Sequence, residues 1–356
     1  MKIVKLVGGL LAALVVLAVV GVSVMKGKAL DRLDQKWDGV KGIDVPVPWP
    51  LSTAELDVLR AQKAQELAAA RAAAGSAGAG EAAPATPPDA DPLAGVDLTA
   101  LARERALERG KHLLDSRLGC AECHGADYGG KVIIDAPPMG VWAAPNISMG
   151  GAGKHLKPAD WDRIVRHGIA RDGTSTTMPA IDFMALSDRE LSDIITVITS
   201  MPPVDRPDVE NVMGPLRGVL IATGAIPVSA EKIDHARPRP TLPPPAEVSA
   251  EFGKHLVGAC VGCHRLNLAG GPAPGGDPSW PDAANLTPDA TGLKGWTADE
   301  FKKAMREGKG KGGREVQEPM KSIAVNALSK LSDTELDAAF LYLQSLAPLA
   351  KGTEAP

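Results

Sequence analysis

A five-residue pattern, in which two cysteines are separated by two residues and followed by histidine, occurs twice in this chain. The copies occupy residues 120–124 and 260–264 and contain all four cysteines. This pattern is the attachment signature of c-type haem. Both thiols bond covalently to one porphyrin, and the histidine becomes the proximal ligand of its iron. The sequence therefore predicts two covalently bound haem c groups, held by Cys120, Cys123 and His124 and by Cys260, Cys263 and His264.

Other uses of paired cysteines fit this chain less well. Two such pairs can form a four-thiolate zinc site, but they then usually lie within a few tens of residues of each other. Here they begin at residues 120 and 260. A single pair can act as a redox dithiol, but two copies that are each followed by histidine are a poor fit to that chemistry. Haem attachment is the better interpretation.

The first haem iron needs a second axial ligand, and methionine is common in that place in electron-transfer cytochromes. Its soft thioether stabilises ferrous iron. Met178 lies between two expected helices and is followed by Pro179, which would stiffen the ligand loop. We predict Met178 as the ligand, with Met184 as its competitor.

The second iron has a corresponding candidate in Met320, although Lys321 stands where the first copy has proline. Met305 is the other methionine in this part of the chain, and it falls inside the preceding expected helix. We predict Met320 as the ligand. If Met320 does not bind, the second haem would be five-coordinate or ligated by histidine. The remaining histidines are expected to face solvent or to make polar contacts, and not to bind metal: His112, His155, His167, His235 and His255.

The surroundings of the two motifs also repeat, which indicates two copies of one module. Each copy ends in a capping box followed by apolar residues with helical spacing. No convincing strand pattern is present, so the expected fold is all-α. The repeated pieces are residues 110–113 and 253–256, Asn146-Ile147-Ser148 and Asn285-Leu286-Thr287, and Ser187-x-x-Glu190 and Ser332-x-x-Glu335.

The N-terminus carries a run of 20 residues without charge, Leu6 to Met25, flanked by lysines. A helix of this length spans a bilayer. No good cleavage site follows it, which favours an uncleaved transmembrane anchor over a cleaved signal peptide. The short basic N-terminus should stay in the cytoplasm. We therefore expect a single-pass protein of the bacterial inner membrane with its haem domains in the periplasm.

The rest of the chain divides by composition. A capping box at Ser52-x-x-Glu55 begins an alanine-rich helical segment, and the stretch from Gly75 to Pro92 is a flexible Ala/Gly/Pro linker. Within the later proline-rich linker, residues 219–226 predict a short helix. The predicted parts are the anchor (1–28), a periplasmic spacer (29–92), the first module (93–205), the linker (206–246) and the second module (247–350).

Composition and charge narrow the function. The net charge is −4, which gives no reason to expect a nucleic-acid partner. Only 3% of residues are aromatic, so a bound macrocycle would supply planar apolar bulk to small cores. One stretch of the second module is basic and could steer an acidic redox partner, or it could be an ordinary solvated face. Its members are Lys302, Lys303, Arg306, Lys309, Lys311 and Arg314.

With these motifs, the chain resembles membrane-anchored di-haem cytochromes c built from two class I cytochrome c modules, including the cytochrome subunits of periplasmic quinoprotein alcohol dehydrogenases. The resemblance covers about residues 95–350. It rests on both haem motifs, Asn285-Leu286-Thr287-Pro288, Met178-Pro179 and the paired Leu-Ser-Asp-x-Glu-Leu helix starts. It implies His/Met ligation at both irons and electron transfer between a donor and an acceptor.

The expected function is transfer of single electrons between respiratory partners, without catalysis by the chain itself. Partners of this kind include a dehydrogenase, a quinol-oxidising complex, a soluble cytochrome and a terminal oxidase. The alternative is a di-haem peroxidase-like enzyme, which needs one iron with an open site. The irregular sequence around Met320 keeps that alternative open.

Overall fold

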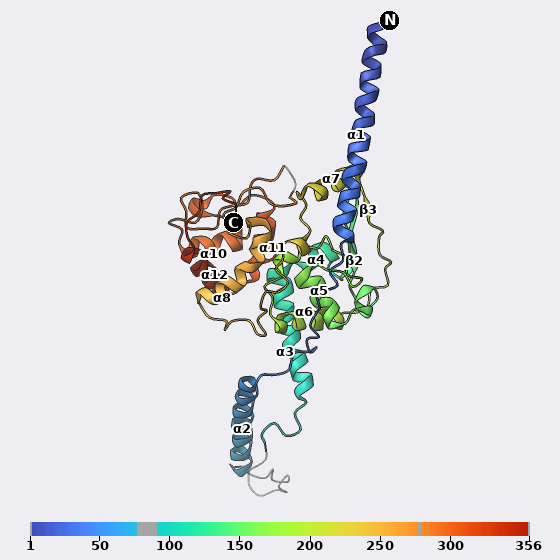
Figure 1. Cartoon of the computed structure of the whole chain (residues 1–356). Helices are drawn as coiled ribbons and strands as arrows, with labels where there is room; N and C mark the ends of the chain where they lie inside the picture. Colours follow the sequence, from blue (N-terminus) through green and yellow to red (C-terminus); the bar gives the residue numbers. More distant parts are fainter. Residues whose placement is uncertain (1, 77–90, 277–278, 355–356) are drawn as a thin grey trace.

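The computed structural model describes residues 2–76, 91–276 and 279–354 (Figure 1). Most of the predicted linker from Gly75 to Pro92 lies outside these residues. The described chain forms two helical modules side by side, with one long helix projecting from the first module and a second helical arm projecting at the opposite end (Figure 1).

Each module has the same four helices in the same order. In both, the first and last helices pack across each other, and a glycine allows the close approach: Gly110 meets the carbonyl of Asp193, and Gly253 meets the carbonyl of Ala338. The first module consists of α3 (Leu98–Leu113), α4 (Cys120–His124), α5 (Pro158–His167) and α6 (Asp188–Ser200). The second consists of α8 (Ala250–Val257), α9 (Val261–His264), α10 (Ala298–Glu307) and α12 (Asp333–Ser345), with an additional α11 (Met320–Asn326).

Both predicted capping boxes are confirmed. Ser187 accepts a hydrogen bond from the Glu190 amide and the Glu190 side chain accepts one from the Ser187 amide, so two amide donors that the helix start cannot pair are satisfied. Ser332 and Glu335 do the same for α12. The apolar residues after each box lie in the module cores, as their helical spacing predicts.

The expectation of an all-α fold is incomplete, because the first module carries a small antiparallel sheet. Its strands are β1 (Gly129–Ala136), β2 (Gly140–Asn146) and β3 (Val212–Met213), in that order across the sheet. The β-branched run Val132, Ile133 and Ile134 favours a strand. β1 is fully buried only at Gly129, whereas Trp142 on β2 and Met213 on β3 pack against the core around Ala29. β1 therefore lacks the apolar alternation that identifies a half-buried strand in sequence.

The long helix α1 (Lys2–Asp34) is built into the first module at its C-terminal end. Ala29 is fully buried in a core shared with α7 (Pro215–Thr223), which confirms the short helix expected in the linker. Arg32 forms an ion pair with Glu231. The chain then runs along the module, where Val45 enters its core and the Ile43 amide bonds to Asp162. Parts of the segment 29–50 therefore pack against the first module.

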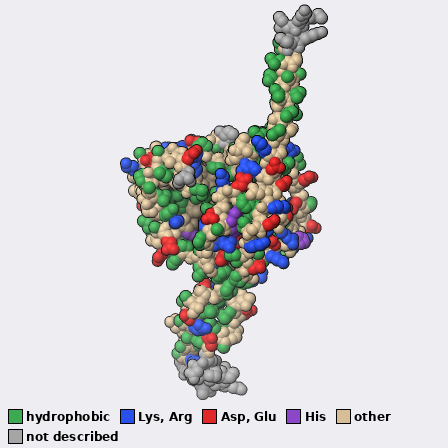
Figure 2. Space-filling model, in the orientation of Figure 1, with side chains coloured by type: hydrophobic (Ala, Val, Ile, Leu, Met, Phe, Trp, Pro, Cys, Tyr) green, Lys and Arg blue, Asp and Glu red, His purple; other side chains and the backbone are tan. Residues whose placement is uncertain are grey.

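The second projecting element is α2 (Thr53–Ser76), the alanine-rich helix expected after Ser52. It extends away from the module on the side opposite α1 (Figure 1). Hydrophobic side chains cover the projecting part of α1, whereas charges of both signs intermingle on the globular face in view (Figure 2). One helix, Val7–Asp34, is long and apolar enough to cross a membrane by length and composition.

Candidate functional site

The first cysteine motif forms the one-turn helix α4, which places both thiols and the histidine on one short element. The His124 Nδ1 atom lies 2.9 Å from the carbonyl oxygen of Pro145. A ring nitrogen facing a carbonyl carries the proton and donates it, which leaves the lone pair on Nε2. An iron ligand requires this tautomer, because the free lone pair on Nε2 is what binds the metal. The hydrogen bond at Nδ1 also fixes the orientation of the ring.

The second motif repeats this geometry on α9. The His264 Nδ1 atom lies 2.7 Å from the carbonyl oxygen of Ala284, and the side chain is buried. Burial lowers the pKa of both His124 and His264. The neutral imidazole is therefore favoured in each module, and only the neutral form binds a metal.

The carbonyls that orient the two histidines were not predicted as functional groups. Each precedes a buried asparagine, and the side-chain oxygens of Asn146 and Asn285 accept bonds from the amide and hydroxyl of Ser148 and Thr287, respectively. These local turns fix the backbone that carries the carbonyl. The signal was visible in the sequence as a repeated Asn-x-Ser/Thr element, but its connection to the histidines appears only in the structure.

All four cysteines are free thiols within the described residues. Burial raises the pKa of Cys120 and of Cys260 to about 12, so these thiols are far from the thiolate form that a redox dithiol uses. Across the part of the chain that the structure describes, no three Cys, His, Asp or Glu side chains converge on a point that could hold a metal ion. Both observations favour covalent attachment of a macrocycle over the zinc and dithiol alternatives.

Around the first motif, the residues present fit a haem. Cys120 and Met178 pack against one apolar core, which also contains Trp161. Trp161 is only 3% exposed, yet its indole Nε1 has no hydrogen-bond partner within the described residues. The Thr176 hydroxyl, two residues before Met178, is also buried without a hydrogen-bond partner among the described residues. Buried donors are rarely left unpaired, and a haem carboxylate would satisfy them.

This fit gives a prediction for the Trp161→Phe variant. It should keep its haem but lose a charge-assisted hydrogen bond, which costs about 1.5–3 kcal/mol in the free energy of unfolding. Denaturant titration followed by haem absorbance measures the loss. Trp142→Phe is the matched control, because Trp142 already donates to the Thr177 hydroxyl at 3.2 Å and should lose no more than about 1 kcal/mol. Equal stability of Trp161→Phe and the native protein would contradict the assignment.

The second site differs from the first in two ways. Phe301 occupies the position of Trp161, so no indole donor is present there. Met305 packs against the core that holds Cys260, where it takes the place of the buried Val165 of the first module. Met320 is half-buried at the start of α11. Met178 thus packs against the first core, whereas Met320 is not among the residues that pack against the second.

Two of the other histidines do not face solvent but make buried polar contacts. His167 is buried and lies 2.9 Å from His235, Nδ1 to Nδ1. His255 is almost fully buried and its Nε2 lies 2.8 Å from the Glu190 carboxylate. His112 is half-buried against Glu335 at 2.9 Å. Periodicity could not reveal these positions, because their partners are distant in the sequence.

The last two pairs join the modules reciprocally. His112 on α3 of the first module pairs with the capping-box glutamate of the second, and His255 on α8 of the second pairs with the capping-box glutamate of the first. The two histidines belong to one repeated element, Gly-Lys-His-Leu, and the two glutamates to another. The two modules therefore contact each other through equivalent surfaces.

The basic stretch on the second module is largely neutralised by its own acids. Lys302 contacts Asp337 at 3.1 Å and Arg306 contacts Asp333 at 2.7 Å. Lys309 lies 3.9 Å from Glu307. A pattern of short-range pairs produces a weaker long-range field than the sequence alone indicates, which favours the ordinary solvated face.

Comparisons with known proteins agree with this geometry. Residues 250–347 match the family model described as cytochrome c, and residues 105–196 match the model for cytochrome c oxidase, cbb3-type, subunit III. The cytochrome c subunits of alcohol dehydrogenase (quinone) from Gluconacetobacter polyoxogenes and Komagataeibacter europaeus are each 28% identical over 291 residues. The match covers 72% of this chain, which spans about 60% of the length of those relatives.

Each matched region contains one cysteine motif and its oriented histidine. The chain is thus a cytochrome c with two cytochrome c domains in tandem, and it resembles the cytochrome c subunits of quinone alcohol dehydrogenases.

Proposed function

We propose that this protein binds two covalent haem c groups and passes single electrons from a respiratory donor to an acceptor. The carrying observation is that His124 and His264 are held in the same tautomer by equivalent carbonyls, each beside the two free thiols of its motif. When bound, each haem supplies an iron that accepts and releases one electron. In this proposal the four cysteines attach the haems, and the ligands are His124, Met178, His264 and Met320.

The chain's own residues prepare the sites for rapid electron exchange. Oriented histidines and a methionine loop packed on the core keep the ligand positions fixed, so that little rearrangement accompanies a change in charge. The apolar cores exclude water from the ligand side, which favours the state of lower charge.

We further propose that α1 anchors the protein in the bacterial inner membrane with both domains in the periplasm. The helix is apolar over its projecting part, and its last turns are buried in the first domain. Ala29 and Arg32 hold it there through packing and an ion pair. This supports an uncleaved anchor that holds the first domain at a fixed height above the bilayer, with α2 projecting away from it (Figure 1).

The partners in this proposal are redox proteins at the membrane surface. The cytochrome subunits of quinone alcohol dehydrogenases are the curated relatives, so a dehydrogenase or a quinol-oxidising complex is the proposed donor. A soluble cytochrome or a terminal oxidase is the proposed acceptor. The protein could serve such a role as a subunit of a larger complex, in which the projecting α2 would be available for contact.

The test is the absorption spectrum of the oxidised protein, read for the weak sulfur-to-iron charge-transfer band of methionine-ligated haem. In the native protein, we expect a band intensity that corresponds to two methionine-ligated haems. Met178→Ala and Met320→Ala should each show about half of that intensity, because each variant removes one thioether. Met305→Leu is the control and should keep the full band, since Met305 fills a core position.

A native band worth only one haem, together with high-spin features, would contradict Met320 as a ligand. It would indicate an open iron in the second domain and make peroxide turnover the next measurement. Loss of the band in Met305→Leu would show that the ligand comes from α10 instead.

A further inference from the structure

The turn that follows Met178 in the first domain reaches across to the haem-attachment motif of the second. Asp182 ends the short 3₁₀ turn Ala180–Asp182. Its Oδ1 atom accepts a hydrogen bond from the backbone amide of Gly262 at 2.7 Å. Gly262 lies between Cys260 and Cys263, in the loop that would carry both thioether bonds. A carboxylate from one domain thus contacts the attachment loop of the other.

Small residues in the second motif make room for this contact. A Cβ atom at position 262 would collide with the Asp182 carboxylate, and one at Gly258 would lie 2.8 Å from the Cβ of Ala185. The corresponding residue in the first motif is Glu122, whose amide bonds to the carbonyl of Gly119 at 3.0 Å within its own turn. The contact is therefore made in one direction only, unlike the reciprocal pairs of His112 with Glu335 and His255 with Glu190.

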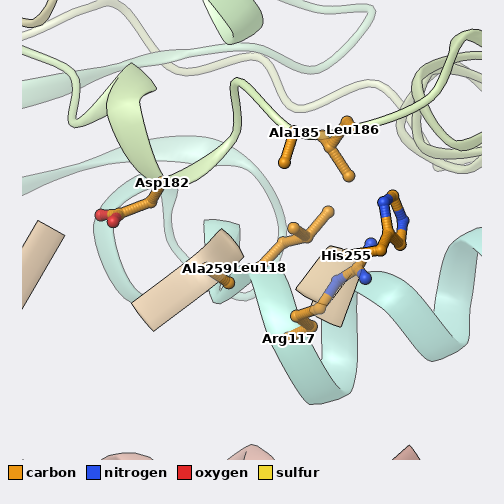
Figure 3. Close-up of a pocket in the computed structure, with 7 residues that line it drawn as sticks. All are labelled: Arg117, Leu118, Asp182, Ala185, Leu186, His255 and Ala259. Carbon is orange, nitrogen blue, oxygen red and sulfur yellow. The ribbon is translucent and has the colours of Figure 1, made fainter. Parts of the chain in front are cut away.

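The surrounding interface holds the two domains in place. Arg117 and His255 both contact the Glu190 carboxylate, with Arg117 on the first domain and His255 on the second. Arg117 and His255, together with Asp182 and Ala259, line a small, partly open space of about 10 Å³, which holds at most about one water molecule. Figure 3 shows Asp182 on one side of this space and Arg117 with His255 on the other.

We propose that Asp182 is a positioning residue for the second haem, supplied by the first domain. The Asp182 carboxylate would hold the Cys260–Cys263 loop in the orientation that attachment requires, and would place a negative charge beside it. A nearby anion stabilises the more positive, oxidised iron, so Asp182 would lower the reduction potential of the second haem relative to a neutral side chain. This rests on the proposed function, because it requires a haem in each domain.

The experiment compares Asp182→Asn and Asp182→Ala in the full-length, haem-loaded protein at pH 8. Burial raises the pKa of Asp182 only to about 6, so the native carboxyl is ionised there. Potentiometric titration resolves the two haems, and amide hydrogen exchange reports on the Gly262 bond independently of redox activity. Asp205→Asn is the matched control, since it removes one exposed negative charge from the residues at the end of the first domain.

Asp182→Asn should raise the potential of the second haem and leave Gly262 protected, because an amide oxygen still accepts the bond. Asp182→Ala should also raise the potential of the second haem. In addition, it should increase the amide exchange rate at Gly262 about tenfold, because loss of a hydrogen bond that contributes about 1.4 kcal/mol makes local opening about ten times more frequent. Asp205→Asn should change neither quantity at the second haem.

Unchanged potential and unchanged exchange in both Asp182 variants would overturn the proposal. Should Asp182→Ala fail to fold, Asp182→Asn alone decides the question of charge, and Gly262→Ala, which collides with the carboxylate, decides the question of contact. A native protein with only one haem would instead refute the proposed function, so the two failures are distinguishable by haem content before any potential is measured.

Discussion

Replacing Cys260 and Cys263 by alanine should halve the haem content and unfold the second domain while the first stays folded. The buried cores of that domain contain two aromatic residues, Phe252 and Phe301, among small and aliphatic side chains. Without a covalent macrocycle, these residues cannot bury enough apolar surface to offset the conformational entropy of about a hundred residues. The alkaline pyridine spectrum measures the haem content, and limited proteolysis measures the unfolding of the second domain.

The matched variant replaces Cys120 and Cys123 in the first domain. It should also lose half of the haem, but residual helical structure is expected there, because α1, α7 and the linker form a separate core around Ala29 and Ile221. A protease should therefore leave a longer fragment than in the first variant. Full haem content in either double variant would contradict attachment through these cysteines.

The second large effect is expected for Glu190→Ala, which should lower the free energy of unfolding by about 3–5 kcal/mol. Glu190 is 7% exposed and accepts bonds from Arg117, which is itself 5% exposed, and from His255. Removing the carboxylate leaves the guanidinium buried without its charge partner. The capping box of α6 is lost as well. Denaturant unfolding of the haem-loaded protein measures the change.

Glu335→Ala is the matched control, because Glu335 caps α12 in the same way and pairs with the equivalent histidine. It has no buried arginine partner, and His112 is 41% exposed, so its loss should cost only about 1 kcal/mol. The difference between the two variants reports the contacts of Glu190 with buried Arg117 and buried His255 together. Equal losses would show that capping alone accounts for both.

The contribution of Glu190 to the free energy of unfolding should also depend on pH. Its partners hold the pKa of this carboxyl well below its ordinary value, despite the opposing effect of burial. A group with a lowered folded-state pKa stabilises the protein above its unfolded pKa of about 4.3, and this contribution is lost as the pH falls below that value. The difference in stability between the native protein and Glu190→Gln should therefore shrink between about pH 5 and pH 2.

Much of the local structure could be read from the sequence. The two cysteine motifs, the capping boxes at Ser187 and Ser332 and the apolar periodicity after them depend on residues close together in the chain, so each helix start and each attachment loop was predictable. The same locality identified α1 as apolar and α2 as a helix. The roles of Met178 and Met320 as ligands remain predictions.

Other features depend on contacts between distant residues, and only the tertiary structure decided them. β1 has no apolar face buried in a core, so it carried no alternating signal, and the contact of Trp142 on β2 with the core around Ala29 joins residues far apart in the chain. Ala29 and Val45 look like spacer residues until the chain folds back onto the first module.

The interface between the domains is the clearest case. The sequence by itself determined two haem-binding modules, because covalent attachment requires a short motif that any copy of the module must carry. It did not determine how they meet. The pairing of His255 with Glu190 and of Asp182 with the Gly262 amide joins residues 65 and 80 positions apart, and such contacts follow from the packing of whole surfaces and not from any local pattern.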